Sequence, residues 1–272
     1  RDPAFTIFSG DINFGPDYTQ EYPESWEIMR RRGVSLACAP RNHDGYAWTL
    51  PSNGPLDYDG LYLWRKTFGP EYYSFKYGPL RVVTANSFSG HSKRRNALTF
   101  MVVNAGAEMD ATQLAWIEQQ AQEATAANQE MLIHMHHNPS PQKSISPNVV
   151  SYPWDITNVG AGNGIWNDVV PREELNRIAG DWSGFKWFFA GHTNHDEHTI
   201  IRLSGAAGPH DVHYVNTTTP CNGSNSPYEG YRMVTVRNGR ISSVDRPYGA
   251  AGNGQSVPFP LGGGPGVNLF AA

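Results

Sequence analysis

Four short apolar runs along this chain each end in a polar block that carries metal-ligand side chains. The blocks are Gly10-Asp11, Asn42-His43-Asp44, His136-His137 and Gly191-His192-Thr193-Asn194-His195. Because the carboxyl ends of parallel strands meet at one edge of a sheet, this recurrence favours an α/β protein with its site at that edge. Carboxylate, amide and imidazole donors suit Mn, Fe, Zn or Mg, and none of the blocks contains a thiol.

The first two blocks lie on either side of a strand–helix–strand pattern. Residues 4–9 and 34–39 are apolar runs of the length expected for buried strands. Residues 25–32 between them have helical spacing, with Ser25 as the expected N-cap and a glycine directly after them. This order is typical of a parallel sheet whose strands alternate with helices.

The rest of the chain repeats these patterns. A helix is expected over residues 110–128, because Asp110 can cap its first turn and Gln113 stands at the capping-box position. Pro171 is expected to begin another helix, and Asn238-Gly239 predicts a type I′ hairpin turn. Further strands are expected over residues 72–77, 80–85, 98–104, 130–135, 185–190, 199–203, 212–216, 231–236 and 240–244.

Two long insertions rich in Trp and Tyr, residues 45–70 and 140–170, leave from the polar blocks. Loops of this length are usually functional or disordered. Their aromatic side chains suit stacking on a nucleobase or an aromatic leaving group, or packing against a sugar. They equally suit a contact between subunits, since Trp and Tyr are enriched at interfaces. The sequence leaves these readings open.

Composition narrows the class of partner. The formal net charge of −4 argues against binding of a long nucleic acid, and no apolar run is long enough to span a membrane. The two cysteines, Cys38 and Cys221, allow one disulfide at most and no zinc ribbon. The scarcity of lysine and the glycosylation sequons at Asn216 and Asn222 favour a secreted or extracytoplasmic protein.

In their order along the chain, the blocks resemble those of calcineurin-like metallophosphoesterases of the purple acid phosphatase and phosphodiesterase type. That family reads Gly-Asp, Gly-Asn-His-Asp/Glu, a His before His-Pro or Ser-Pro, and Gly-His-x-His. The resemblance covers residues 4–245 and includes the segments at 68–87 and 110–120. It implies a four-layer α/β/β/α sandwich of two mixed sheets flanked by helices over residues 1–246. Residues 247–272, rich in Gly and Pro, are then expected to be a tail or linker.

The resemblance also implies a site with two divalent metal ions and assigns roles to residues. Asp11 would bridge the metals, Asn42 would bind one of them through its amide oxygen, and His136 and His192 would be imidazole ligands. His43 would not bind metal but would protonate the leaving-group oxygen as the general acid. A hydroxide held by the two metals would attack a phosphate mono- or diester of small size.

The sequence departs from the family pattern in three places. The family's Asp-x-His block is absent, so the first strand is missing from this chain or is supplied by a separate polypeptide. Asn194 stands where the last histidine belongs, so either Asn194 or, through a bulge, His195 would be the ligand. Arg41 replaces the glycine before Asn42 and could contact the phosphate.

These departures keep a second function open. A family member that has lost a complete metal site would serve as a structural or binding protein instead of an enzyme. A metal-dependent peptidase or amidase is disfavoured, because the chain contains no HExxH helix. The sequence does not separate monoesters from diesters.

Overall fold

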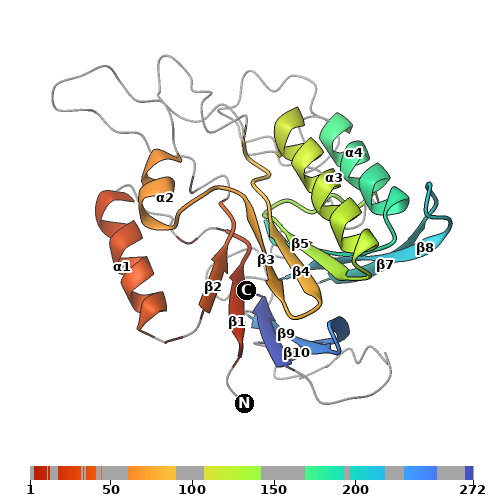
Figure 1. Ribbon diagram of the computed structural model, residues 1–272. Helices are drawn as coiled ribbons and strands as arrows, with labels where there is room; N and C mark the ends of the chain where they lie inside the picture. Colours follow the sequence, from red (N-terminus) through yellow and green to blue (C-terminus); the bar gives the residue numbers. More distant parts are fainter. Residues whose placement is uncertain are drawn as a thin grey trace.

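Two β-sheets lie face to face, and helices cover the outer face of each sheet, so that the fold has four layers (Figure 1). Helices α1 (Tyr18–Arg30) and α2 (Tyr62–Thr67) lie beside the first sheet, and α3 (Ala111–Ala126) and α4 (Val169–Asp181) cover the second. The computed structural model describes residues 3–10, 12, 18–31, 33, 35–40, 44, 61–89, 107–141, 169–192, 197–217, 230–249 and 267–271.

The first sheet is mixed and has five strands. Its strand order is β10 (Arg240–Gly249), β9 (Gly230–Arg237), β11 (Val267–Ala271), β1 (Phe5–Phe8) and β2 (Ser35–Cys38). Strands β11, β1 and β2 are parallel, whereas β9 is antiparallel to both β10 and β11. The carboxyl ends of β1 and β2 therefore point to the same edge of the sheet.

The second sheet is also mixed and has six strands. Its order is β3 (Tyr73–Tyr77), β4 (Leu80–Thr84), β5 (Glu130–His134), β6 (Phe185–Ala190), β8 (His210–Asn216) and β7 (Glu197–Leu203). Strands β4, β5, β6 and β8 are parallel, and the two edge strands run antiparallel to them. The segments that follow β4, β5 and β6 therefore leave from one edge of this sheet.

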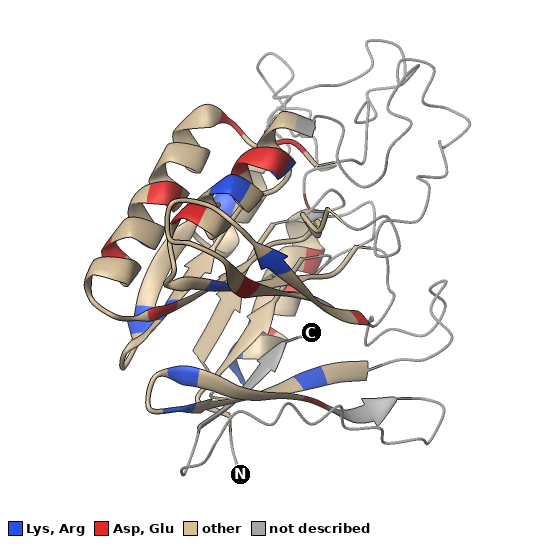
Figure 2. Ribbon diagram, turned by 90° about the vertical axis from the view of Figure 1, so that its right-hand side faces the viewer, with Lys and Arg blue, Asp and Glu red and all other residues tan. Residues whose placement is uncertain are grey.

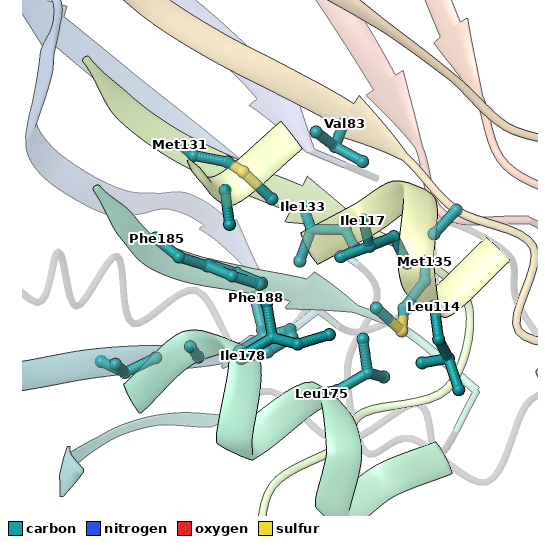
Figure 3. Close-up of a cluster of buried hydrophobic side chains, with 14 of the residues drawn as sticks. Val83, Leu114, Ile117, Met131, Ile133, Met135, Leu175, Ile178, Phe185 and Phe188 are labelled. Atoms are coloured by element: carbon teal, nitrogen blue, oxygen red, sulfur yellow. The ribbon is translucent and has the colours of Figure 1, made fainter. Parts of the chain in front are cut away.

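Alternation along the strands of the second sheet divides their side chains between two of the hydrophobic cores. One core lies between the second sheet and α3 and α4, where Ile133, Ile117 and Phe188 pack together (Figure 3). The other core lies between the two sheets and joins Ile7 of β1 to Leu132 of β5. Successive side chains of a strand point to opposite faces, so neighbouring residues of β5 are divided between the two cores.

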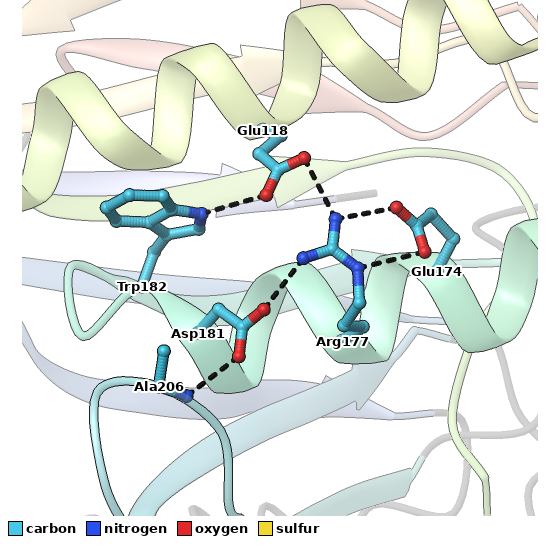
Figure 4. Close-up of polar contacts among 6 residues, drawn as sticks. All are labelled: Glu118, Glu174, Arg177, Asp181, Trp182 and Ala206. Atoms are coloured by element: carbon cyan, nitrogen blue, oxygen red, sulfur yellow. Dashed lines mark hydrogen bonds and ion pairs between the residues drawn. The ribbon is translucent and has the colours of Figure 1, made fainter.

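A cluster of ion pairs ties α3 and α4 to the loop between β7 and β8 (Figure 4). Arg177 of α4 donates to Glu118 of α3 at 2.8 Å, to Glu174 at 3.0 Å and to Asp181 at 2.7 Å. Asp181 in turn accepts a hydrogen bond from the backbone N–H of Ala206 at 2.8 Å. One guanidinium therefore links three elements on the outer side of the second sheet.

The helices largely follow the sequence pattern. The Asp110 side chain caps α3 by accepting a hydrogen bond from the Gln113 N–H at 2.8 Å, as predicted. Helix α1, however, begins at Tyr18 and contains Pro23, so the expected start at Ser25 is wrong. Proline lacks an N–H and usually ends a helix, but the turn before Pro23 is held by Tyr22, which is fully buried in the core beside α2.

The C-terminal segment differs from the expected tail or linker. Strand β10 continues to Gly249, beyond the expected domain boundary at residue 246, and residues 267–271 form β11. This strand pairs with β1 in the register Phe5↔Leu269 and with β9 on its other side. It completes the sheet because β1 and β9 would otherwise leave their backbone groups unpaired.

The described surface carries charges of both signs. Lys, Arg, Asp and Glu are interspersed over the described helices and strands, in keeping with the small net charge (Figure 2). Among the described residues, no helix has the length and apolar character needed to cross a membrane. The strand expected over residues 98–104, the insertion at 140–170 apart from its first two and last two residues, and residues 45–60 of the other insertion lie outside the described residues.

Candidate metal centre

Three histidines meet where two neighbouring parallel strands end. His136 and His137 follow β5, and His192 follows β6, which is the next strand in the sheet. One ring nitrogen from each of them lies within 4.8 Å of the other two. His136 Nε2 and His192 Nδ1 are 2.8 Å apart, and both His136 and His137 are fully buried. The shared edge of β5 and β6 therefore holds a group of three imidazoles.

Backbone pairing between the two strand ends brings these rings together. The Met135 N–H donates to the Phe189 carbonyl at 3.0 Å, and the Gly191 N–H donates to the His136 carbonyl at 3.0 Å. The ladder of β5 and β6 thus continues beyond the strands to the residue before His192. His192 itself has a φ of 65°, a left-handed conformation that is uncommon outside glycine. Such strain is found mainly where the surrounding structure holds a functional side chain.

The hydrogen bond to Ser9 determines which ring nitrogen of His136 is available. His136 Nδ1 lies 3.0 Å from the Ser9 carbonyl, which can only accept, so Nδ1 carries the proton. The lone pair of Nε2 therefore points to His192 Nδ1. Ser9 follows β1, so this contact also joins the end of the first sheet to the cluster.

His137 is held by a residue from a third strand end. Its Nδ1 lies 2.8 Å from the Ser87 hydroxyl, and its backbone N–H donates to the same oxygen at 3.1 Å. Ser87 follows β4, and the register of β4 and β5 places Thr84 opposite His134, three residues before each partner. Nδ1 is thereby engaged, which leaves Nε2 as the nitrogen that a metal could use.

Polar groups between the sheets lie behind the cluster. The Thr84 hydroxyl lies 2.6 Å from His134 Nε2, and Tyr73 accepts a hydrogen bond from the Cys38 N–H at 3.0 Å. Burial lowers the pKa of His134 to about 3, so this ring is neutral. Burial, together with the nearby Asp44 carboxylate, raises the pKa of the Cys38 thiol to about 12, so it offers no thiolate.

Of the residues that the sequence assigns to the site, His136 and His192 are brought together. Asp11, Asn42, His43, Asn194 and His195 lie outside the described residues. Of their described neighbours, Ser9 contacts His136, and Asp44 is buried and accepts a hydrogen bond at its carbonyl from the Tyr22 hydroxyl at 2.7 Å.

Sequence reasoning did not assign roles to His137 and Ser87. His137 belongs to the block His136-His137, but the resemblance assigns a ligand role to only one histidine of that block. For Ser87 the available signal was the polar pair Asn86-Ser87 directly after an apolar strand, which is the pattern that identified the other blocks. From the insertion at 45–70, Trp64 is fully buried against Tyr22 and Phe68, so it is a core residue and does not face a ligand.

The donor set fits a divalent metal. Nε2 of His136 carries the lone pair of the ring and faces His192 Nδ1 at 2.8 Å, the distance of a hydrogen bond between two potential metal ligands. Neutral imidazoles are the commonest metal ligands in proteins, and their second nitrogen usually donates to a carbonyl or another polar group. The Ser9 contact of His136 has this form.

Comparison with known proteins supports the fold. No protein-family model and no curated protein matches the sequence. The structure of a purple acid phosphatase from seeds of yellow lupin (Lupinus luteus) matches with a TM-score of 0.52 and 13% identity, over 98% of this chain and 46% of the lupin chain. A dimetal phosphatase from Danio rerio matches with a TM-score of 0.45 and 12% identity, over 80% of this chain and 90% of its own.

The lupin comparison establishes the fold alone, because identity is low and this chain spans about half of the lupin protein. The two facing mixed sheets and the covering helices agree with the four-layer architecture that the resemblance implies. The three histidines lie at the carboxyl ends of β5 and β6, which is the edge where those blocks place the site. The chain therefore has the α/β/β/α fold of the calcineurin-like metallophosphoesterases.

Proposed function

We propose that this protein is a metal-dependent phosphoesterase that hydrolyses a small phosphate ester. The observation that carries the proposal is the group of His136, His137 and His192 at the strand ends of this fold, of which His136 and His137 are fully buried. Burial of the His136 and His137 imidazoles costs free energy, and a bound cation would give this pair and the adjacent His192 a shared partner.

The ligands would come from four strand-end segments. In the described part of the chain they are His136 Nε2, His137 Nε2 and His192 Nδ1. Asp11, Asn42 and either Asn194 or His195 would complete a site for two divalent ions, for which Mn, Fe, Zn and Mg are the candidates. When bound, such ions would neutralise the phosphate charge and activate a water molecule.

Residues that do not bind metal would protonate the leaving group and favour the class of substrate. His43 would give a proton to the leaving oxygen, which matters most for alcohols that leave poorly as anions. It directly precedes Asp44, whose backbone carbonyl is held by the Tyr22 hydroxyl. The small net charge and the mixed surface favour a small ester over a long polyanion. Secretion remains a prediction from the sequence.

The test begins with the metal content of protein purified without chelator, followed by titration of the metal-free protein with Mn²⁺ or Zn²⁺. We expect about two ions per chain, in line with two-metal hydrolases, and a large loss of affinity in His136→Gln. The matched control is His210→Gln, which changes a histidine at the first residue of β8 whose ring nitrogens contact the Gly208 and Ala179 carbonyls.

Activity is then measured with alkyl and nitrophenyl phosphates, as monoesters and diesters. His43→Ala should reduce turnover of the alkyl ester much more than that of the nitrophenyl ester, because nitrophenolate needs no proton to leave. Metal binding without hydrolysis of any ester would support the alternative of a binding protein. A chain that takes up no metal under any of these conditions would overturn both the enzyme proposal and its ligand set.

A further inference from the structure

Ser87 is a buried serine whose hydroxyl contacts one histidine twice. It accepts a hydrogen bond from the His137 backbone N–H at 3.1 Å and lies 2.8 Å from Nδ1 of the same residue. Both residues are fully buried. They are separated by 50 positions in sequence and meet because β4 and β5 are adjacent and parallel.

The loop that carries Ser87 is itself held by buried hydrogen bonds. The Gln113 side chain accepts from the Asn86 N–H at 2.7 Å and donates to the Asn86 carbonyl at 2.9 Å. The Asn86 side chain accepts from the Phe88 N–H at 2.8 Å. Gln113 therefore does not complete the capping box that the sequence suggests, and instead clamps this loop to α3.

Further contacts leave the Ser87 backbone little freedom. The Ser87 carbonyl accepts from the Glu108 N–H at 2.9 Å, and the Ser89 N–H donates to the Glu108 carbonyl at 3.1 Å. Asn86 Nδ2 donates to Glu71 at 2.8 Å. The backbone before and after Ser87 is thus held by hydrogen bonds before any ligand binds.

We infer that Ser87 is a positioning residue that orients His137 as a metal ligand through Nε2. This inference rests on the proposed function. Two hydrogen bonds from one residue to one oxygen fix both the backbone and the ring plane of His137. If Nδ1–H donates to the hydroxyl, the lone pair is left on Nε2, as metal binding requires.

The opposite direction of the same bond defines the competing arrangement. A hydroxyl that donates to Nδ1 would leave the proton on Nε2 and would exclude neutral His137 from the ligand set. The ring nitrogen of His137 that carries the proton can be identified without any metal. ¹⁵N NMR of histidine-labelled, metal-free protein distinguishes the two tautomers, with His137→Gln used to assign the signal.

The binding test uses Co²⁺ and Zn²⁺ titrations of the metal-free protein, followed by calorimetry and the visible Co²⁺ spectrum. We expect Ser87→Ala to weaken metal binding roughly 10- to 100-fold, the effect usual for loss of such an outer partner. Ser87→Thr keeps the hydroxyl and should recover most of the affinity. Gln113→Met, which removes the clamp but not the hydroxyl, should fall between the two.

The control for simple destabilisation is Ser242→Ala. This buried serine makes a single hydrogen bond of 3.0 Å to the Thr235 carbonyl in the first sheet. It should lower the thermal midpoint of the metal-free protein as Ser87→Ala does but leave the Co²⁺ spectrum unchanged. A changed spectrum in Ser87→Ala alone is not expected from a merely structural serine.

The outcomes separate the two claims. If the wild-type protein binds metal and Ser87→Ala binds it equally well, the role of Ser87 is overturned and the proposed function stands. A proton on Nε2 of His137 in the NMR experiment would also overturn the role of Ser87. If the wild-type protein binds none of Co²⁺, Zn²⁺, Mn²⁺, Fe²⁺ and Mg²⁺, the proposed function fails and the role of Ser87 fails with it.

Discussion

The two faces of the second sheet differ in what they bury. Towards α3 and α4, β5 presents Met131 and Ile133, and the core there is made of apolar side chains (Figure 3). Towards the first sheet, the same strand presents Leu132 and His134, and His136 follows its last residue by two positions. Because side chains alternate along a strand, one segment of sequence contributes to a stabilising face and to a polar face at once.

Polar side chains on the inner face include a partly buried carboxylate with two hydrogen-bond donors. Glu130 accepts hydrogen bonds from the Trp187 indole N–H and from the Ile241 N–H, both at 2.8 Å, and burial raises its pKa. The inner layer leads to the strand ends where the histidine cluster lies. The helix-facing side of the second sheet therefore contributes mainly to stability, and the side facing the first sheet leads to the candidate metal centre. Substitutions on each side can test this division.

The largest effect is expected on the helix side. Phe188 is fully buried and stacks on Tyr214 with ring centroids 4.9 Å apart. Phe188→Ala should lower the free energy of unfolding by about 3–5 kcal/mol, because it removes a large apolar side chain and leaves a cavity. Denaturant unfolding measures the loss, and metal affinity of the folded fraction should not change. A parallel loss of affinity would show that the two faces are not independent.

The inner face should respond to pH. His198 Nε2 lies 3.1 Å from His213 Nδ1, and Trp187 stacks on His213 at 3.8 Å. Burial, together with His213 and Arg232, lowers the pKa of His198 to about 3. Burial lowers the pKa of His213 to about 4, with a smaller lowering from Lys186 and an opposing effect of Asp211.

A lowered pKa means that the folded state excludes a proton that the unfolded chain binds below about pH 6.5. The contribution of both histidines is therefore complete above pH 6.5 and is lost as the pH falls towards 4 and then 3. From pH 7 to pH 5 we expect a loss of about 2 kcal/mol, after allowance for partial exposure. The reference is the double variant His198→Gln/His213→Gln, unfolded under the same metal-free conditions. An identical pH slope in the two proteins would refute the assignment.

A smaller effect is expected at the outer rim of the helix face. Arg177 joins Glu118, Glu174 and Asp181, but its side chain is 42% exposed. Arg177→Met should lower the free energy of unfolding by about 1 kcal/mol, and high salt should reduce the difference. A loss as large as that of Phe188→Ala would mean that the ion-pair cluster, and not the apolar core, holds α4 in place.

The smallest effect is expected beside the metal centre. A Cβ at position 191 would lie 3.8 Å from His136 Nδ1 and 4.0 Å from the Ser9 carbonyl oxygen, which are ordinary contacts. Gly191→Ala should therefore change stability by under about 0.5 kcal/mol and leave metal affinity unchanged. Gly239→Ala is the contrasting variant, because its Cβ would meet Pro79 at 2.4 Å and its φ is +73°. Similar results for both glycines would contradict this reading of the space around Gly191.

The sequence pattern correctly predicted strands and turns that depend on residues close together in the chain. The strand over 185–190 has the expected bounds, and both residues of the Asn238-Gly239 turn have positive φ, as a type I′ turn requires. The start of α1 was predicted wrongly, since the packing of Tyr22 against a distant helix outweighs the local effect of Pro23. The strand at 267–271 was also missed, because a short apolar run in a Gly/Pro-rich segment shows no partner in the sequence.

The candidate site was predictable only in part for the same reason. Strand-end positions indicated that His136 and His192 would meet, and their roles as ligands stay predictions. The contribution of Ser87 depends on the register of β4 and β5, which pairs Thr84 with His134. That register is a property of the assembled sheet and leaves no spacing pattern in the chain.

The position of β11 has a consequence for the order of folding. All strands of the second sheet lie between residues 73 and 216, so that sheet and its helices can pack once residue 216 has been synthesised. The first sheet is different, because its middle strand comes from residues 267–271 and pairs with a strand that begins at residue 5. Contacts this distant in sequence form slowly. The first sheet is therefore the last part of the molecule to close, and until then β1 and β9 expose edges open to pairing with another chain.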